Sequence, residues 1–243
     1  MPYLIEIATT DFTTTSSAVR GGADRIELCS AISEGGLTPS YALIRRCIQA
    51  FELPIFPIIR PRSGDFLYSN DEFEIILDDI RVCKELGCRG LVTGFLNPAG
   101  EIDVDRLKRV LDAAEEMEVT FHRAFDRCAD PFVALEQIIS AGCKRILTSG
   151  QQLKALDGSA LIRELVSTAA GRIIIMPGSG VKPGNIRQLA DATGAVELHG
   201  ALRNTKASEM AFHLPQFLAV EDYLNPHIDE AEVRAMKKAL TSE

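Results

Sequence analysis

The sequence contains no tryptophan, and aromatic residues make up only 6% of its 243 positions. It also has no excess of positive charge, because 34 acidic residues outweigh 26 lysines and arginines and leave a net charge of −8. Nucleic-acid binding requires clustered basic side chains, so this balance argues against a nucleic-acid partner. The chain has no apolar run near the roughly 18 residues of a membrane span and no basic start typical of a signal peptide. We therefore expect a cytoplasmic protein without a membrane partner.

The cysteines are too widely spaced to form a Cys-x-x-Cys metal or redox motif. A chain of 243 residues buries a core large enough to fold without disulfide bonds. We expect reduced thiols at all six positions, which are Cys29, Cys47, Cys83, Cys88, Cys128 and Cys143.

Short apolar runs recur along the chain with helical patterns between them. Each run is nearly continuously apolar, which is typical of strands buried on both faces of a parallel sheet. The segments between them carry apolar residues at helical spacing, as in Phe73, Ile76, Leu77 and Ile80. The eight predicted strands are Leu4–Ile7, Arg25–Leu28, Ile55–Ile59, Gly90–Thr93, Val119–Phe121, Arg145–Leu147, Arg172–Met176 and Ala195–Leu198.

A glycine before every second strand supports this alternation. Gly22, Gly87, Gly142 and Gly194 each end a helical pattern and precede an even-numbered strand. A repeat at this interval fits a barrel whose interior layers are filled by alternate strands. We predict an α/β fold with one (β/α)8 TIM-type barrel domain of parallel strands over residues 1–243, with the barrel at about 3–203. A doubly wound open sheet is the alternative, but it would need about 100 fewer residues or a second domain.

The segment 204–243 forms a C-terminal extension and closing helix in this interpretation. Asp229–Leu240 has a helical pattern with Asp229 as its N-cap. The stretch before it shows no clear element, yet it is too apolar for a free linker. We expect its large side chains to pack on the barrel or on another subunit; they are Phe212, Leu214, Phe217, Leu218 and Tyr223.

The stretch Thr120–Asp126 places an imidazole, a guanidinium and a carboxylate directly after the fifth strand. In TIM barrels the chemistry lies at the carboxyl ends of the strands, so residues that follow each strand are candidates. Proton transfer needs a positioned group with a pKa near the working pH. The candidate catalytic residues are Glu27, His122 and Asp126.

Charged side chains also lie within or just after other apolar strands. A buried charge needs a partner, so Glu6 and Glu27 should pair with Arg60, Arg62, Arg123 or a histidine. A structural ion network closing the top of the barrel is the alternative interpretation. The candidate ligand-binding residues are Glu6, Arg60, Arg62, Arg123, Ser149, Gly178, Ser179, Gly180, His199 and Arg203.

Two loops support the prediction of a small-molecule site. Gly178–Gly180, after the seventh strand, lies where barrels often bind a phosphate or carboxylate on backbone N–H groups. Alternatively, Gly178–Gly180 is a tight turn that binds no ligand. Arg60–Ser69 is rich in arginine, aromatics and glycine, which is typical of a lid or rim.

Several motifs resemble those of the CutC family. They are Ile26–Ser30 with Glu34–Ser40, Ile59–Arg62 with Gly64–Tyr68, Thr120–Asp126 and Leu147–Gly150. The resemblance runs from the first strand to about Arg203. It implies a cytoplasmic single-domain barrel that forms homo-oligomers, acts in copper homeostasis and binds copper(I).

This sequence departs from the family pattern at the expected copper site. Human-type members carry a cysteine on the first strand beside the one on the second, but here Ala8 leaves Cys29 alone. Ala201 also replaces a common serine after the last strand. Copper(I) prefers thiolates, and only Cys128 joins Cys29 on the predicted site face, from a distant strand. Alternatively, Cys29 is not a copper ligand but a small apolar residue buried in the core.

Two hypotheses of function follow. One is a copper(I)-binding homeostasis protein that uses Cys29, aided by His122, His199 or Met176. The other is an enzyme acting on a small anionic metabolite, phosphorylated or carboxylated. In the second hypothesis Arg60, Arg62 and the loops after the last two strands hold the anion.

Overall fold

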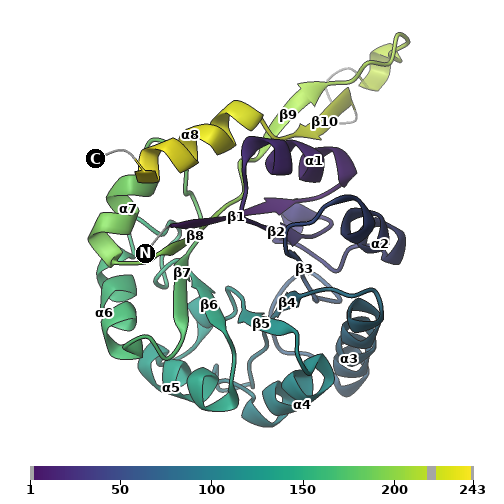
Figure 1. The fold of residues 1–243 in the computed structure, drawn as a ribbon. Helices are drawn as coiled ribbons and strands as arrows, with labels where there is room; N and C mark the ends of the chain where they lie inside the picture. Colours follow the sequence, from purple (N-terminus) through teal and green to yellow (C-terminus); the bar gives the residue numbers. More distant parts are fainter. Residues whose placement is uncertain (1–2, 218–222, 242–243) are drawn as a thin grey trace.

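The structure is a computed structural model that describes residues 3–217 and 223–241. Eight parallel strands alternate with helices and form a ring with the helices outside (Figure 1). This confirms the predicted TIM-type α/β fold. The strands are β1 (Leu4–Thr9), β2 (Arg25–Leu28), β3 (Ile55–Pro57), β4 (Gly90–Thr93), β5 (Glu118–Phe121), β6 (Arg145–Thr148), β7 (Ile174–Pro177) and β8 (Glu197–Gly200).

The ring consists of two hydrogen-bonded halves. One has the strand order β3-β2-β1-β8 and the other β4-β5-β6-β7. A bridge between Ile58 and Val92 joins β3 to β4, whereas no backbone ladder joins β7 to β8 among the described residues. Parallel register places the carboxyl ends of all these strands at one end of the ring.

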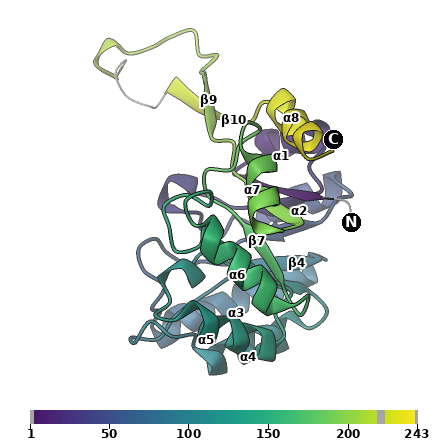
Figure 2. The ribbon, with the colours of Figure 1, turned by 90° about the vertical axis from the view of Figure 1, so that its left-hand side faces the viewer.

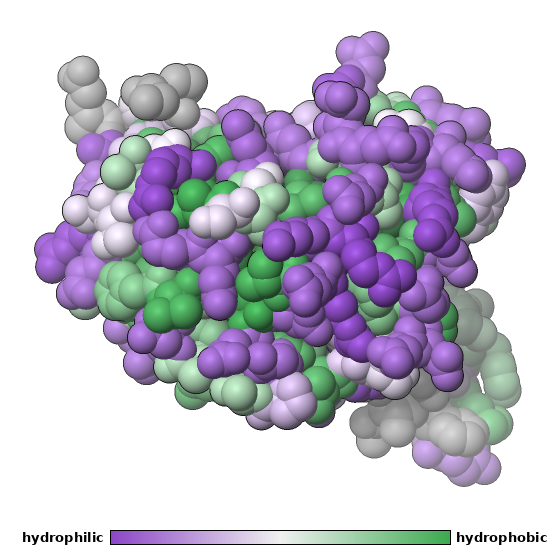
Figure 3. Space-filling model, turned by 90° about the horizontal axis from the view of Figure 1, so that it is seen from below, coloured by the Kyte–Doolittle hydropathy of each residue, from purple (hydrophilic) through white to green (hydrophobic). Residues whose placement is uncertain are grey.

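The ends of the outer helices α1 and α5 illustrate their sequence signals. Asp130 caps α5 through hydrogen bonds from Phe132 and Val133, and the caps of α1 and α5 are left-handed glycines, Gly22 (φ 93°) and Gly142 (φ 108°). The flank seen in Figure 3 is mainly hydrophilic with scattered apolar patches, as expected for amphipathic helices. The helices are α1 (Phe12–Gly21), α2 (Tyr41–Ala50), α3 (Asn70–Glu85), α4 (Val104–Ala114), α5 (Pro131–Ala141), α6 (Ser159–Ala169), α7 (Ile186–Thr193) and α8 (Glu230–Thr241). None of the described helices is both long and apolar enough to cross a membrane.

A charged layer fills the barrel interior. Arg25 bonds the Glu6 carboxylate through Nε and Glu197 Oε2 through Nη2, the latter at 2.6 Å. Arg145 bonds the same Glu197 oxygen at 3.0 Å and Glu118 at 2.7 Å. The partners expected for Glu6 were a histidine or one of Arg60, Arg62 and Arg123; its arginine partner is instead Arg25, on the adjacent strand. This layer is a structural ion network, but four of its residues are the first residues of β2, β5, β6 and β8, whereas the alternative from the sequence placed a network at the top of the barrel.

The C-terminal extension contains an arm that projects from the barrel (Figures 1 and 2). The strands β9 (Asn204–Ala207) and β10 (Leu224–His227) pair antiparallel at its base. Phe212 is 69% exposed, so it does not pack on this barrel. Leu218, which was expected to pack with it, lies outside the described residues. Asp229 accepts a hydrogen bond from Ala231 N at 2.8 Å and so caps α8 as predicted.

Candidate functional site

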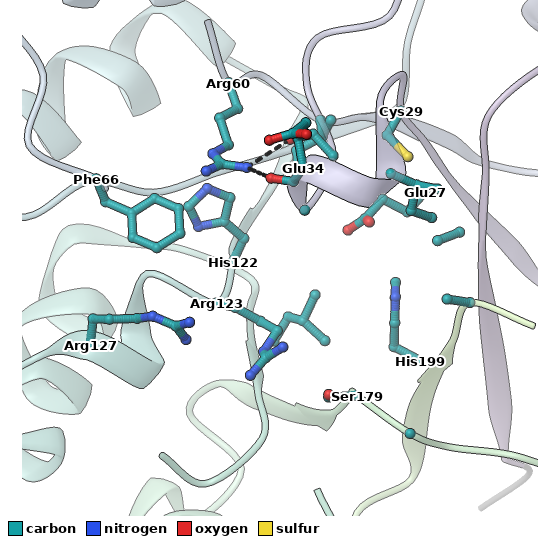
Figure 4. A pocket seen from close by; sticks show the side chains of 18 of the residues that line it. Glu27, Cys29, Glu34, Arg60, Phe66, His122, Arg123, Arg127, Ser179 and His199 are labelled. Atoms are coloured by element: carbon teal, nitrogen blue, oxygen red, sulfur yellow. Dashed lines mark hydrogen bonds between the residues drawn. The ribbon is translucent and has the colours of Figure 1, made fainter. Parts of the chain in front are cut away.

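A cavity of about 940 Å³ lies at the carboxyl ends of the strands. The 60–67 loop, the 3-10 turn after β5 and the loops after β7 and β8 contribute to its wall. Titratable side chains dominate its polar lining (Figure 4). They are Glu27, Glu34, Arg60, Asp65, His122, Arg123, Arg127, Lys182, His199, Arg203 and Glu232.

Glu27 and His199 lie in the cavity beside the interior ion layer. His199 Nδ1 lies 2.8 Å from Glu6 Oε1, which orients the imidazole ring. Neither Glu27 oxygen accepts a hydrogen bond from the described residues, and Oε2 is fully buried. One ligand atom from each of these three side chains lies within 4.8 Å of the others. Of the three side chains, Glu27 is the one that makes no hydrogen bond within the described residues.

The pKa values of this cluster reflect burial and charge. Burial alone would raise the pKa of Glu6, but the charge of Arg25 and the bond to His199 lower it to about 2. Burial raises the pKa of Glu27 to about 7, because the nearby His199 charge offsets only part of the desolvation. For His199, burial lowers the pKa but the charges of Glu27 and Glu6 and the Glu6 bond outweigh it and raise it.

His122 occupies a different environment. Its Nδ1 accepts a hydrogen bond from Ala124 N at 3.2 Å, and its buried Nε2 has no partner among residues 3–217 and 223–241. Burial, followed by the charge of Arg60, lowers the pKa of this imidazole to about 3. His122 is therefore neutral at physiological pH and can offer an N–H donor but no positive charge.

Arg60 is buried without a carboxylate partner in the described chain. Its guanidinium donates to the carbonyl oxygens of Glu34 at 2.7 Å, Gly36 at 3.2 Å and Gly64 at 2.8 Å, and it lies 5.0 Å from the Phe66 ring. These bonds tie two loops together at the cavity wall. They leave the positive charge of Arg60 uncompensated by an anion.

Further unpaired cations surround the mouth. Arg127, Lys182 and Arg203 line the cavity, and their side chains make no ion pair or hydrogen bond within the described residues. Arg123 differs because its Nε bonds Asp126 at 2.6 Å and its Nη2 bonds Ser149 Oγ at 2.8 Å. The mouth therefore carries positive charge that the described protein groups do not neutralise.

The loop after β7 presents backbone donors to the same cavity. Ser179 has φ 90° and Gly180 φ 72°, so both lie in the left-handed region. The N–H groups of Ser179, Gly180 and Val181 donate to no acceptor in the described part of the chain. Amides arranged this way are suited to an anion. The Ser179 hydroxyl itself donates to Leu153 O at 2.8 Å.

Five predicted site residues do not line the cavity, although some support it. Arg62 bonds Glu72 at 2.6 Å and Asp65 at 3.0 Å at the rim. Asp126 accepts bonds from the loop after β6, and its side chain is only 1% exposed. The structure thus places these residues around the cavity wall: Glu6, Arg62, Asp126, Ser149 and Gly178.

Sequence reasoning missed Arg127 and Lys182. Arg127 immediately follows the Thr120–Asp126 stretch, and Lys182 lies two residues after the Gly178–Gly180 loop. Extending each candidate segment by two residues would have found both. Phe66, which stacks on Arg60 and contacts His122 with ring centroids 4.9 Å apart, lies within the predicted rim loop.

The sulfur content of the cavity bears on copper(I). Cys29 is the one sulfur-bearing residue among the described residues that line it, and its thiol donates to Thr9 O at 3.4 Å. Burial raises the pKa of this thiol, which opposes thiolate formation. Ala8 lines the same cavity, and Cys128 does not reach it. These donors do not fit the thiolate preference of copper(I).

Fold and site together define a TIM-type barrel with a charged cavity at the carboxyl ends of its strands. The model of the CutC family matches residues 3–204, and the chain belongs to this family.

Curated relatives and a solved structure agree with this assignment. A CutC family protein from Pasteurella multocida is 42% identical over 239 residues, covering 97% of this chain and 98% of the relative. The human copper homeostasis protein cutC homolog is 44% identical over 210 residues, covering 86% of this chain and 77% of the relative. The solved structure of CutC from Streptococcus agalactiae is 31% identical, with a TM-score of 0.78, and the match covers 82% of this chain and 98% of that one.

More distant structures share only the fold. A phosphoribosylanthranilate isomerase from Thermotoga maritima is 14% identical, with a TM-score of 0.58 and 98% of each chain covered. At this identity the likeness supports the barrel and says nothing of the reaction.

Proposed function

We propose that this protein is an enzyme acting on a small anionic metabolite, phosphorylated or carboxylated, in the cavity at the carboxyl ends of its strands. The observation that carries the proposal is the positive charge of Arg127, Lys182 and Arg203 around the mouth, beside three backbone amides; within the described residues these cations form no ion pair and these amides have no acceptor. A bound anion would complete both sets of donors.

The remaining cavity groups suit a reaction on such a ligand. Arg60 and neutral His122 provide donors on the β3 and β5 side, and the loop after β7 provides donors on the opposite side. Glu27 lies on β2 and His199 on β8, on either side of β1, and their side chains face the same space (Figure 4). We place these two side chains at the reacting end of the bound metabolite. Asp126, fully engaged with its neighbours, is a positioning residue.

Binding is tested with inorganic phosphate and simple dicarboxylates by calorimetry at low ionic strength. The double variant Lys182→Gln/Arg203→Gln should bind phosphate at least about tenfold more weakly, since each charge-assisted hydrogen bond contributes about 1.5 to 3 kcal/mol. The control Lys108→Gln/Arg109→Gln removes the same charge from the outer helix α4. Equal affinity in the two double variants would contradict the proposed anion site.

Turnover is tested by incubating a panel of phosphorylated and carboxylated metabolites with wild type and with Glu27→Gln, followed by NMR. Chemical change that requires Glu27 would support an enzyme. Binding of several anions without change in any of them would indicate a binding protein.

Copper(I) binding by Cys29 is the second candidate, favoured by the name of the human relative. Anaerobic titration with copper(I) against a competing chelator tests it. An affinity that is unchanged in Cys29→Ala would exclude this residue as the ligand. The cytoplasmic location, the homo-oligomer and the absence of a nucleic-acid partner stay predictions.

A further inference from the structure

We propose that Glu27 and His199 bind a divalent transition-metal ion at the base of the cavity, with Glu6 as the residue that positions His199. The role of this ion in catalysis rests on the proposed function, but its binding does not. No sulfur takes part, so the site differs in kind from a copper(I) site.

The first support is the placement of the three side chains. They come from the adjacent strands β2, β1 and β8, whose register pairs Glu6 with His199 and places Glu27 opposite Ala8. One ligand atom from each side chain lies within 4.8 Å of the others, a separation that a single ion can bridge. Because all three side chains are anchored on strands, little chain ordering is needed on binding.

The second support is the unsatisfied state of Glu27. This residue is only 7% exposed, yet neither carboxylate oxygen has a hydrogen-bond donor in the described chain. In the interior layer Arg25 and Arg145 already balance Glu6 and Glu197. Glu27 is therefore an additional buried acid that accepts no hydrogen bond in the described chain; the charges of His199, Arg25 and Arg203 act on it, and a metal ion beside it would add a direct ligand bond.

The third support is the arrangement around His199. Its Nδ1 faces Glu6 Oε1 at 2.8 Å, which leaves Nε2 without a partner among the described residues. A carboxylate that holds one ring nitrogen while the other binds a metal is a recurrent arrangement in metalloproteins. Both oxygens of Glu6 are engaged, by His199 and by Arg25, so Glu6 orients the ligand instead of binding the ion.

The ligand set indicates the class of ion. One carboxylate and one imidazole suit zinc, manganese or ferrous ions, whereas copper(I) prefers sulfur. Two protein ligands leave the other coordination positions open to the cavity, where water or an oxygen of the anionic metabolite could bind. The cations at the mouth and the ion at the base would then hold the same anion.

Metal binding is measured by calorimetry with Zn²⁺, and by electron paramagnetic resonance with Mn²⁺, on full-length protein freed of metal by a chelator. Glu27→Gln and His199→Gln should each weaken Zn²⁺ binding by more than a hundredfold. Glu6→Gln should weaken it by about 10- to 100-fold, as expected for a residue that orients a ligand. Glu232→Gln, which alters a carboxylate at the cavity rim, should leave the affinity unchanged.

A second readout separates loss of ligands from loss of fold. Nitrogen chemical shifts of labelled histidine should show Zn²⁺ at Nε2 of His199 in the wild type, and far-ultraviolet circular dichroism should show that each variant is folded. Zn²⁺ binding that is equal in wild type and a folded Glu27→Gln, or no saturable binding of Zn²⁺ or Mn²⁺, would overturn the inference. Phosphate binding that persists without metal would leave the proposed anion site intact.

Discussion

The substitution Asp126→Asn should destabilise the protein through the wall of the cavity. Asp126 Oδ1 accepts from Ser149 N at 2.9 Å and Gln151 N at 3.2 Å, and Oδ2 accepts from Arg123 Nε at 2.6 Å. The hydroxyls of Thr148 and Ser149 also donate to this carboxylate. An asparagine amide group would face at least one N–H donor in either orientation.

The size of the effect follows from these contacts. At 1% exposure the Asp126 side chain has no access to replacement water, and the substitution also removes the negative charge that partners Arg123. Removing one member of a buried ion pair costs about 3 to 5 kcal/mol. Because the Arg123 side chain is one third exposed, we expect the lower part of this range, about 3 kcal/mol.

The assay is urea unfolding at neutral pH, with the slope checked for a common unfolding transition. Asp65→Asn serves as a control, because it removes a largely exposed carboxylate bonded to Arg62 and should change the free energy of unfolding by less than about 1 kcal/mol. A loss below about 1 kcal/mol for Asp126→Asn would refute the structural account. Lost turnover at full stability would support the catalytic role predicted from the sequence.

Three further predictions concern the floor and walls of the cavity. Gly178→Ala would bring a Cβ within 2.5 Å of Leu147 Cδ1, so unfolding experiments should show a loss of about 1 to 3 kcal/mol, whereas Gly184→Ala, with nothing within 4 Å, should show none. Because the pKa of Glu6 is lowered from 4.5 to about 2, its stabilisation is complete above pH 4.5 and is lost as pH falls toward 2; urea unfolding of Glu6→Gln should lack this acid-dependent component. Ala8→Cys would add a second thiol to the cavity wall, and copper(I) titration should show binding at least tenfold tighter than in the wild type. An affinity equal to that of the wild type would show that Cys29 and the new thiol do not bind one copper(I) ion together.

The sequence predicted the fold because its signals are local and repeated. Each strand is a short apolar run, and before every second strand a glycine with positive φ, such as Gly22 or Gly142, ends the preceding helix. The missing ladder between β7 and β8 was not predictable in this way, since it depends on how two distant strands meet. The exposure of Phe212 was not predictable either, because the sequence does not distinguish an apolar side chain on a projecting arm from one that packs on the barrel.

The sequence predicted charged residues at the carboxyl ends of the strands, where the cavity lies, but it did not distinguish those that stabilise the fold from those that line the cavity. Charged residues at strand ends share one sequence signature whether they hold the fold together or face a ligand. Arg25 was not a candidate, because nothing in the sequence shows that its guanidinium reaches across the interior to Glu6 and Glu197. Arg127 was missed because the Thr120–Asp126 stretch ends one residue before it.

The ion pairs and hydrogen bonds of the structure distinguish charged residues that stabilise the fold from charged residues that face the cavity. Arg25, Arg145, Glu6 and Glu197 satisfy one another, so their interactions explain their burial without any ligand. Glu27 is buried beside them without a hydrogen-bond donor in the described residues, and the cations of the mouth lack described acceptors. Since a buried carboxylate without a hydrogen-bond donor destabilises the fold, its position at the base of a cavity is better explained by a bound cation or a reacting group. The missing partners have opposite signs, a cation at the base and an anion at the mouth, and a metal ion bound together with an anionic metabolite would provide both.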